Sequence, residues 1–237
     1  MPRAGAQMRR KGLLFGVGAL VVLLLFGLGV WQVQRLAWKT ALIARVEQGL
    51  SAAPVAAPGP ESWSGLAFDM DEYRRITVTG RYLPSADVLV QAVTTRGPGF
   101  WVMTPFKADA GFTLFINRGF IPADRREPAD RPVPQDTQSL TGLLRLTQPN
   151  GAFLRSNDPA AGRWFSRDTA AMGDALGIGA VAPYFLDADR APDGDTLPIG
   201  GLTVVTFPNN HLSYAITWFV MAGGLAFLLW RVRRHAD

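Results

Sequence analysis

Two long apolar runs lie near the ends of the chain, and shorter alternating patterns fill the region between them. Residues 12–31 form a run of 20 residues without a charge, and residues 212–230 form a run of 19. About 20 apolar residues in a helix are enough to span the hydrocarbon layer of a bilayer. The pattern therefore predicts two transmembrane helices, at residues 12–31 and 209–230.

The first apolar run leads into a second helical pattern rather than into a cleavage site. Apolar residues recur at helical spacing from Val33 to Leu50, and the pattern stops at the Ala- and Pro-rich residues 51–60. A secretory signal peptide would have a shorter apolar region followed by a small-residue cleavage site. We therefore predict an uncleaved anchor whose helix continues to about residue 50 and packs its amphipathic end on the domain that follows.

Small residues at four-residue spacing occur in both apolar runs. Gly12 and Gly16 form one pair, and Ala222 and Ala226 form the other. Such spacing lets helix backbones approach closely in a membrane. These two pairs are the candidates for direct contact between the helices.

The middle of the chain has the pattern of a β-rich domain. In residues 75–82, Ile76 and Val78 alternate with threonines, as in a strand with one buried face. Further short strand patterns, separated by Gly, Pro, Asp and Ser, lie at residues 88–93, 100–106, 112–117, 140–146, 184–186 and 202–207.

One short helix is predicted among the strands, at residues 166–176. Ser166 or Asp168 can cap its start and Gly177 its end. The expected fold class is an α+β membrane protein, in which two transmembrane helices flank an antiparallel β-rich domain at residues 51–208. The strands of that domain form either an open sheet or a barrel-like one.

The net positive charge of the chain sits in its two tails. Of the formal charge of +5, residues 1–11 contribute +4 and residues 231–237 contribute +2, whereas residues 32–210 sum to −1. A nucleic-acid-binding protein would carry a basic patch on its folded domain, so that class is excluded. Basic flanks stay on the cytoplasmic side of a membrane. We therefore expect cytoplasmic termini and a periplasmic central domain.

The residue inventory excludes several kinds of site. The chain has no cysteine and only two histidines, so disulfides, thiolate metal sites and a multi-histidine metal site within one chain are excluded. The glycines at 177 and 179 fit a dinucleotide-binding pattern in spacing, but they follow a helix rather than a strand. No nucleophile–base pair supports a membrane-tethered hydrolase. We expect no enzymatic activity.

Two charged groups in the central region have a structural and a functional interpretation. Asp69, Asp71 and Glu72 form a small acidic cluster, which we interpret as solvated loop charge. Arg118, followed by Gly119 at a predicted strand end, could grip a carboxylate of a partner. We favour an internal role, in which Arg118 satisfies strand-end carbonyls and Gly119 allows the turn.

The entry to the second apolar run carries the densest chemistry. Asn209 or Asn210 can cap this helix, and His211, Tyr214 and Trp218 share one face with Ala215 because they are three, four and seven residues apart. A histidine on the first helical turn is favoured in its neutral, metal-binding form.

The surroundings of His211 leave two interpretations open. Arg35 and Lys39, at the exit of the first helix, would attract anionic groups such as haem propionates, so that His211 could be a haem ligand. Alternatively, His211 is an ordinary interfacial side chain beside an aromatic belt.

Five motifs are spread along nearly the whole chain: LGVWQVQRLAWK at residues 28–39, VTGRY at 78–82, GFWVMTPF at 99–106, NRGFIP at 117–122 and NNHLSYAITWF at 209–219. Together they resemble the Surfeit-one family of cytochrome c oxidase assembly factors, also called the Shy type. Phe120 departs from the family pattern, which usually has tryptophan there.

This resemblance implies a role in building the haem a–copper centre of oxidase subunit I, with His211 as the candidate ligand of haem a. The implied partners are subunit I, other oxidase assembly factors and membrane lipid. The alternative is a cofactor-free scaffold that holds immature subunit I. Because the chain begins just before its first helix, without room for a mitochondrial presequence, we expect a bacterial inner membrane.

Overall fold

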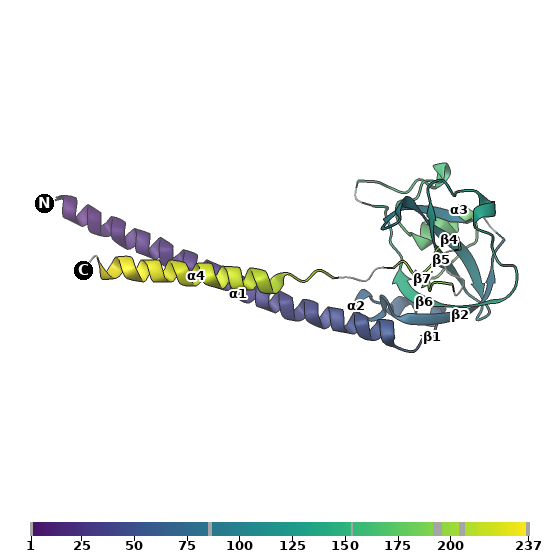
Figure 1. The fold of residues 1–237 in the computed structure, drawn as a ribbon, viewed down its shortest axis with the longest axis horizontal. Helices are drawn as coiled ribbons and strands as arrows, with labels where there is room; N and C mark the ends of the chain where they lie inside the picture. Colours follow the sequence, from purple (N-terminus) through teal and green to yellow (C-terminus); the bar gives the residue numbers. More distant parts are fainter. Residues whose placement is uncertain (1, 85–86, 153, 192–195, 204–206, 236–237) are drawn as a thin grey trace. The chain divides into compact units, whose positions relative to one another are not determined.

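The computed structural model describes residues 2–84, 87–152, 154–191, 196–203 and 207–235, with side chains from residue 12 onward (Figure 1). The chain divides into two units. One, Met1–Ala44 with Thr206–Asp237, is helical, and the other, Arg45–Val205, contains the strands.

The helical unit consists of α1, Pro2–Ser51, whose last turns belong to the second unit, and α4, His211–Arg234. The two helices run side by side in opposite directions (Figure 1). Their apolar segments have mean hydropathies of 2.7 and 1.8, and only 6% and 11% of those windows are buried. The core helix of a water-soluble protein would be mostly buried. Length, composition and exposure together identify a membrane protein with two candidate spans.

The contact between the helices follows a seam with alternating spacings of three and four residues. This 3.5-residue period is typical of helices packed at a shallow angle with side chains interlocked. Phe26 and Phe219 meet across the seam with ring centroids 5.4 Å apart. The least exposed positions along the seam are Phe15, Gly18, Val22, Leu25, Gly29, Gln32 and Leu36 on α1 and His211, Ala215, Trp218, Ala222, Leu225 and Leu229 on α4.

The predicted small-residue contacts are wrong in part. A Cβ placed on Gly12 or Gly16 would meet nothing within 4 Å, so neither glycine faces α4. Ala222 lies in the seam and is buried, whereas Ala226 is exposed. The glycines that do allow close approach are Gly18, opposite Leu229, and Gly29, opposite Phe219. They are spaced along the seam rather than four residues apart.

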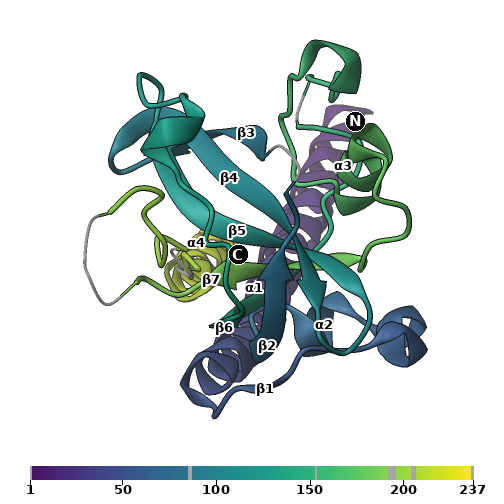
Figure 2. The same ribbon diagram turned by 90° about the vertical axis from the view of Figure 1, so that its right-hand side faces the viewer.

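Within the described residues, the second unit contains seven strands in one mixed sheet, ordered β1-β2-β6-β7-β5-β4-β3. An additional pairing of β2 with β4 joins the ends of β2-β6-β7-β5-β4 by hydrogen bonds, and Figure 2 shows the strands curving round a common interior. The strands are β1 Val55–Ala56, β2 Arg75–Tyr82, β3 Val88–Thr94, β4 Gly97–Ala108, β5 Thr113–Pro122, β6 Gln138–Leu146 and β7 Tyr184–Ala188.

Short helices complete this unit. The helix α3, Thr169–Leu176, begins at Asp168, whose carboxylate accepts a hydrogen bond from Ala171 N, and ends at Gly177 in the left-handed conformation. Both caps agree with the prediction, with Asp168 rather than Ser166 at the start. The other helices are α2 at Phe68–Asp71 and 3-10 turns at Pro60–Gly65, Pro128–Asp130 and Pro159–Ala161.

The prediction of a purely antiparallel sheet is wrong at two pairs of strands. β1 pairs with β2 in parallel, and so does β5 with β7. The strand expected at residues 202–207 is not formed at Leu202 and Thr203, and residues 204–206 lie outside the described residues. Instead Ile199 forms an isolated antiparallel bridge with Phe120.

The alternating pattern of β2 determines which of its faces is buried. Ile76 is fully buried and Val78 nearly so, whereas Thr79 faces outward. Ile76 and Val78 pack with Phe106, Leu114 and other apolar side chains in the main core cluster. This confirms the one-sided strand read from the alternation.

Candidate functional site

His211 opens α4 and contacts a polar side chain of α1. Asn210 precedes it at the N-cap position, without a side-chain capping bond. His211 Nδ1 lies 2.7 Å from Gln32 Oε1. Gln32 is a polar residue flanked by the apolar Trp31 and Val33, and it is only 9% exposed. A buried amide needs a hydrogen-bond partner, and His211 supplies it.

This contact bears on the tautomer of the imidazole. A carbonyl oxygen can only accept a hydrogen bond, so with Oε1 facing the ring the Nδ1 of His211 donates to Gln32. In the neutral ring this leaves the lone pair on Nε2, the nitrogen that can then bind a metal. Orientation of a ligand histidine through its other ring nitrogen is common in metal sites.

The aromatic residues near His211 differ in exposure. Trp218 is half-buried on the seam line that also holds His211 and the buried Ala215. Tyr214 is 55% exposed, so its ring lies off that line. The structure therefore gathers two of the predicted site residues, His211 and Trp218, on the side of α4 that faces α1.

Arg35 and Lys39 follow Gln32 on α1 by three and seven residues, so all three share one side of the helix. The Arg35 guanidinium stacks over the Trp38 ring, 4.8 Å from its centroid. Next to Lys39, Thr40 Oγ1 accepts a hydrogen bond from Asn209 Nδ2 at 3.5 Å, which places the start of α4 beside this part of α1. No direct contact of Arg35 or Lys39 with His211 occurs among the residues described.

The acidic cluster at residues 69–72 is structural, so its interpretation as solvated loop charge is wrong for two of three residues. Asp71 is buried, accepts a hydrogen bond from Ala67 N at 2.9 Å and pairs with Arg74 at 2.9 Å. The buried carboxylate of Glu72 pairs with Arg145 at 2.6 Å. Only Asp69 is exposed.

Glu72 belongs to a buried ionic network that joins three strands. Arg145 on β6 also pairs with Asp187 on β7 at 3.0 Å, and Arg167 lies 3.6 Å from the same carboxylate. Asn117 on β5 donates to Asp187 at 2.7 Å. Burial lowers the pKa of Arg145, but Asp187 and Glu72 outweigh burial and raise it above its ordinary value. Two carboxylates and two arginines thus balance each other.

Arg118 has the internal role that we favoured. Its Nη1 donates to Arg131 O at 3.1 Å, and its Nη2 donates to Pro132 O. Burial lowers the pKa of Arg118, and burial raises the pKa of the neighbouring Tyr82 to about 12. The strand continues past Arg118 to Pro122, so Gly119 does not end it.

Gly119 instead allows another backbone to approach closely. Its φ is +129°, and a Cβ there would lie 2.2 Å from the backbone of Ile199. No side chain other than hydrogen fits between these two segments.

Gln32 is the site residue that the sequence analysis missed. The sequence did contain a signal for Gln32. Leu25, Gly29 and Gln32 follow one another at spacings of four and three residues, so they share one face of the helix, and Gln32 is an uncharged polar residue directly after the apolar run. Across the described residues there is no group of three or more His, Asp or Glu side chains that could hold a metal ion.

Comparison with known proteins places this architecture in a family. The SURF1 family matches residues 19–223, which include both Gln32 and His211. The chain belongs to the SURF1 family. It is 35% identical over 230 residues to Surfeit locus protein 1 of Rattus norvegicus, covering 88% of this chain and 72% of the rat protein.

Members from distant animals give the same result. Surfeit locus protein 1 of Homo sapiens is 34% identical over 86% of this chain and 72% of the human protein. The SURF1-like protein of Drosophila melanogaster is 36% identical over 87% of this chain and 73% of its own length. The SURF1 relationship therefore extends over the helices and the sheet alike.

Proposed function

We propose that this SURF1-family protein is an assembly factor of cytochrome c oxidase that holds haem a through His211 during the building of subunit I. The observation that carries the proposal is the bond between His211 Nδ1 and Gln32 Oε1, at 2.7 Å. In the neutral ring this bond leaves the lone pair on Nε2, the form that a nitrogen ligand of haem iron would need.

The remaining residues fit a porphyrin with acidic side chains. Trp218 offers an aromatic surface two turns along α4 from His211, and Tyr214 adds an exposed ring one turn along. Arg35 and Lys39 supply positive charge for propionates on the neighbouring helix. Bound haem would supply the iron, and the chain supplies one nitrogen ligand, an apolar face and cationic groups.

The proposal includes an orientation in the membrane. The last turn of α4 contains Arg231, Arg233 and Arg234, and basic flanks favour the cytoplasmic side. We propose cytoplasmic termini and a periplasmic sheet domain in a bacterial inner membrane, with subunit I and other assembly factors as partners. A reporter fused after residue 237 should remain cytoplasmic, and export of that reporter would contradict the orientation.

The haem proposal is tested by purifying the full chain from cells that make haem a and recording its absorption spectrum. A Soret band is expected in the wild-type protein and should be lost in His211→Ala. The other histidine provides a matched control: among the described residues, His235 Nδ1 bonds to the Arg231 carbonyl of its own helix, so His235→Ala should keep the band. A colourless wild-type protein that still captures subunit I would instead support the cofactor-free scaffold.

A further inference from the structure

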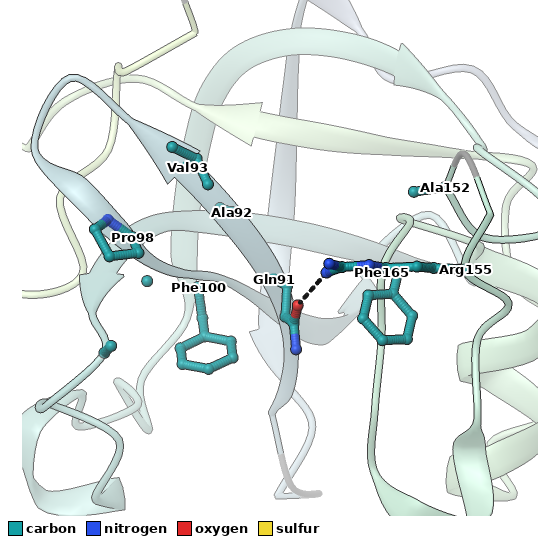
Figure 3. Close-up of a pocket in the computed structure, with 10 residues that line it drawn as sticks. Gln91, Ala92, Val93, Pro98, Phe100, Ala152, Arg155 and Phe165 are labelled. Carbon is teal, nitrogen blue, oxygen red and sulfur yellow. Dashed lines mark hydrogen bonds between the residues drawn. The ribbon is translucent and has the colours of Figure 1, made fainter.

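An open groove lies at the end of β3 that leads into the β3–β4 hairpin. Its residues are far in sequence from His211. It has a volume of about 520 Å³ and runs between the β3–β4 hairpin and a segment near Phe165. Figure 3 shows Arg155 extending from that segment toward Gln91, with the rings of Phe100 and Phe165 on either side. The lining is mainly apolar, and Val93 on its edge is 87% exposed.

The backbone of β3 has hydrogen-bonding groups that point away from β4 at this groove. Among the described residues β3 is the last strand of the sheet, and Gln91 N donates outward to Trp164 O at 2.9 Å. Outward groups recur every second residue, so the N–H and C=O of Val93 also point away from β4. Within the described part of the chain, Trp164 covers the edge as far as Gln91, and no backbone hydrogen bond reaches the outward groups of Val93.

One arginine, Arg155, lines the groove, and a second, Arg126, contacts one of its aromatic rings. Arg155 stacks on Phe165 at 5.5 Å from the ring centroid, and Arg126 stacks on Phe100 at 4.6 Å. Arg155 Nη1 donates to the neutral amide oxygen of Gln91 at 3.5 Å, a long bond that a carboxylate would replace with a stronger one. Among the described residues that line the groove, none is acidic.

We propose that this groove binds an extended, acidic segment of a partner protein as an added β-strand. The segment pairs with the backbone of Val93, its apolar side chains cover Phe100 and Phe165, and its carboxylates meet Arg155 and Arg126. Main-chain pairing to an exposed edge with charged contacts at the rim is a common mode of peptide recognition. This docking surface lies within the sheet domain and does not depend on haem binding by His211.

The test uses the full chain in nanodiscs of uncharged lipid and a fluorescent peptide of alternating valine and glutamate. We expect saturable binding by anisotropy, and no binding of a matched valine–lysine peptide. Arg155→Glu should weaken binding at least about tenfold, because it reverses a charge in the contact. Val93→Pro, which removes the outward N–H at an exposed position, should weaken binding as well.

Lys107→Glu is the matched control, since it makes the same charge change on β4 outside the groove and should leave affinity unchanged. Equal binding of both peptides, equal affinity in all three variants, or no binding of the acidic peptide would overturn the proposal. Retention on anionic vesicles that is lost in Arg155→Glu, without peptide binding, would assign the groove to lipid and also overturn it.

Discussion

Side chains in this protein acquire their roles from partners that lie far away in the sequence. His211 is 179 positions from Gln32, and the Asp187 carboxylate gathers Asn117, Arg145 and Arg167 from three other segments. Composition identifies such residues as polar or charged but says nothing of their partners. A residue of an acidic cluster that looks solvated, here Glu72, can therefore prove to belong to a buried network.

The buried network makes Asp187 a test of how the sheet is held together. Asp187→Asn removes the charge that both Arg145 and Arg167 face, which should cost about 3–5 kcal/mol of unfolding free energy, as breaking a buried pair usually does. Denaturant unfolding of the full chain in detergent measures this loss.

The exposed pair of Arg75 and Asp189 provides the control. The side chain of Asp189 is 42% exposed, so Asp189→Asn should cost less than about 1 kcal/mol. Similar losses in the two variants would show that the interior network contributes no more than a surface pair.

At the scale of elements, local periodicity predicted what is local. The alternation in β2 and the caps of α3 were readable because each depends on residues close in sequence. The parallel pairing of β5 with β7 could not be predicted from the sequence, because it depends on which strands far apart in the chain meet in the sheet. The seam between α1 and α4 was also readable in principle, since its 3.5-residue spacing is present in both runs, but the glycine pairs drew attention to the wrong positions.

The seam predicts different effects for two glycines on α1. A Cβ on Gly29 would lie 2.5 Å from the Phe219 ring, whereas a Cβ on Gly27 would meet nothing within 4 Å. Gly29→Val should therefore cost about 1–3 kcal/mol, as overpacking does. Gly27→Val should change stability by less than about 0.5 kcal/mol, like most exposed substitutions. Thermal unfolding of both variants in the same detergent compares them, and equal stability would refute the helix pairing described here.

For the whole molecule, the positions of apolar and basic residues along the chain were more informative about the protein class than the overall composition was. The two apolar runs and the basic tails indicated a membrane protein, and the sheet between them agrees with the expected α+β class. The family was visible in motifs spread over the chain, because membership is carried by many short patterns at once. The role of Gln32 and the open edge at Val93 were not visible, since both arise only when separate segments meet in space.

The most direct measurement of the central claim is the nitrogen NMR spectrum of the full chain labelled at histidine. The chain has only two histidines, and His235→Ala assigns them. We predict that His211 is neutral with its proton on Nδ1, and that Gln32→Leu abolishes this preference. A His211 ring protonated on Nε2, or a spectrum unaffected by Gln32→Leu, would contradict the claim that Gln32 prepares Nε2 to bind iron.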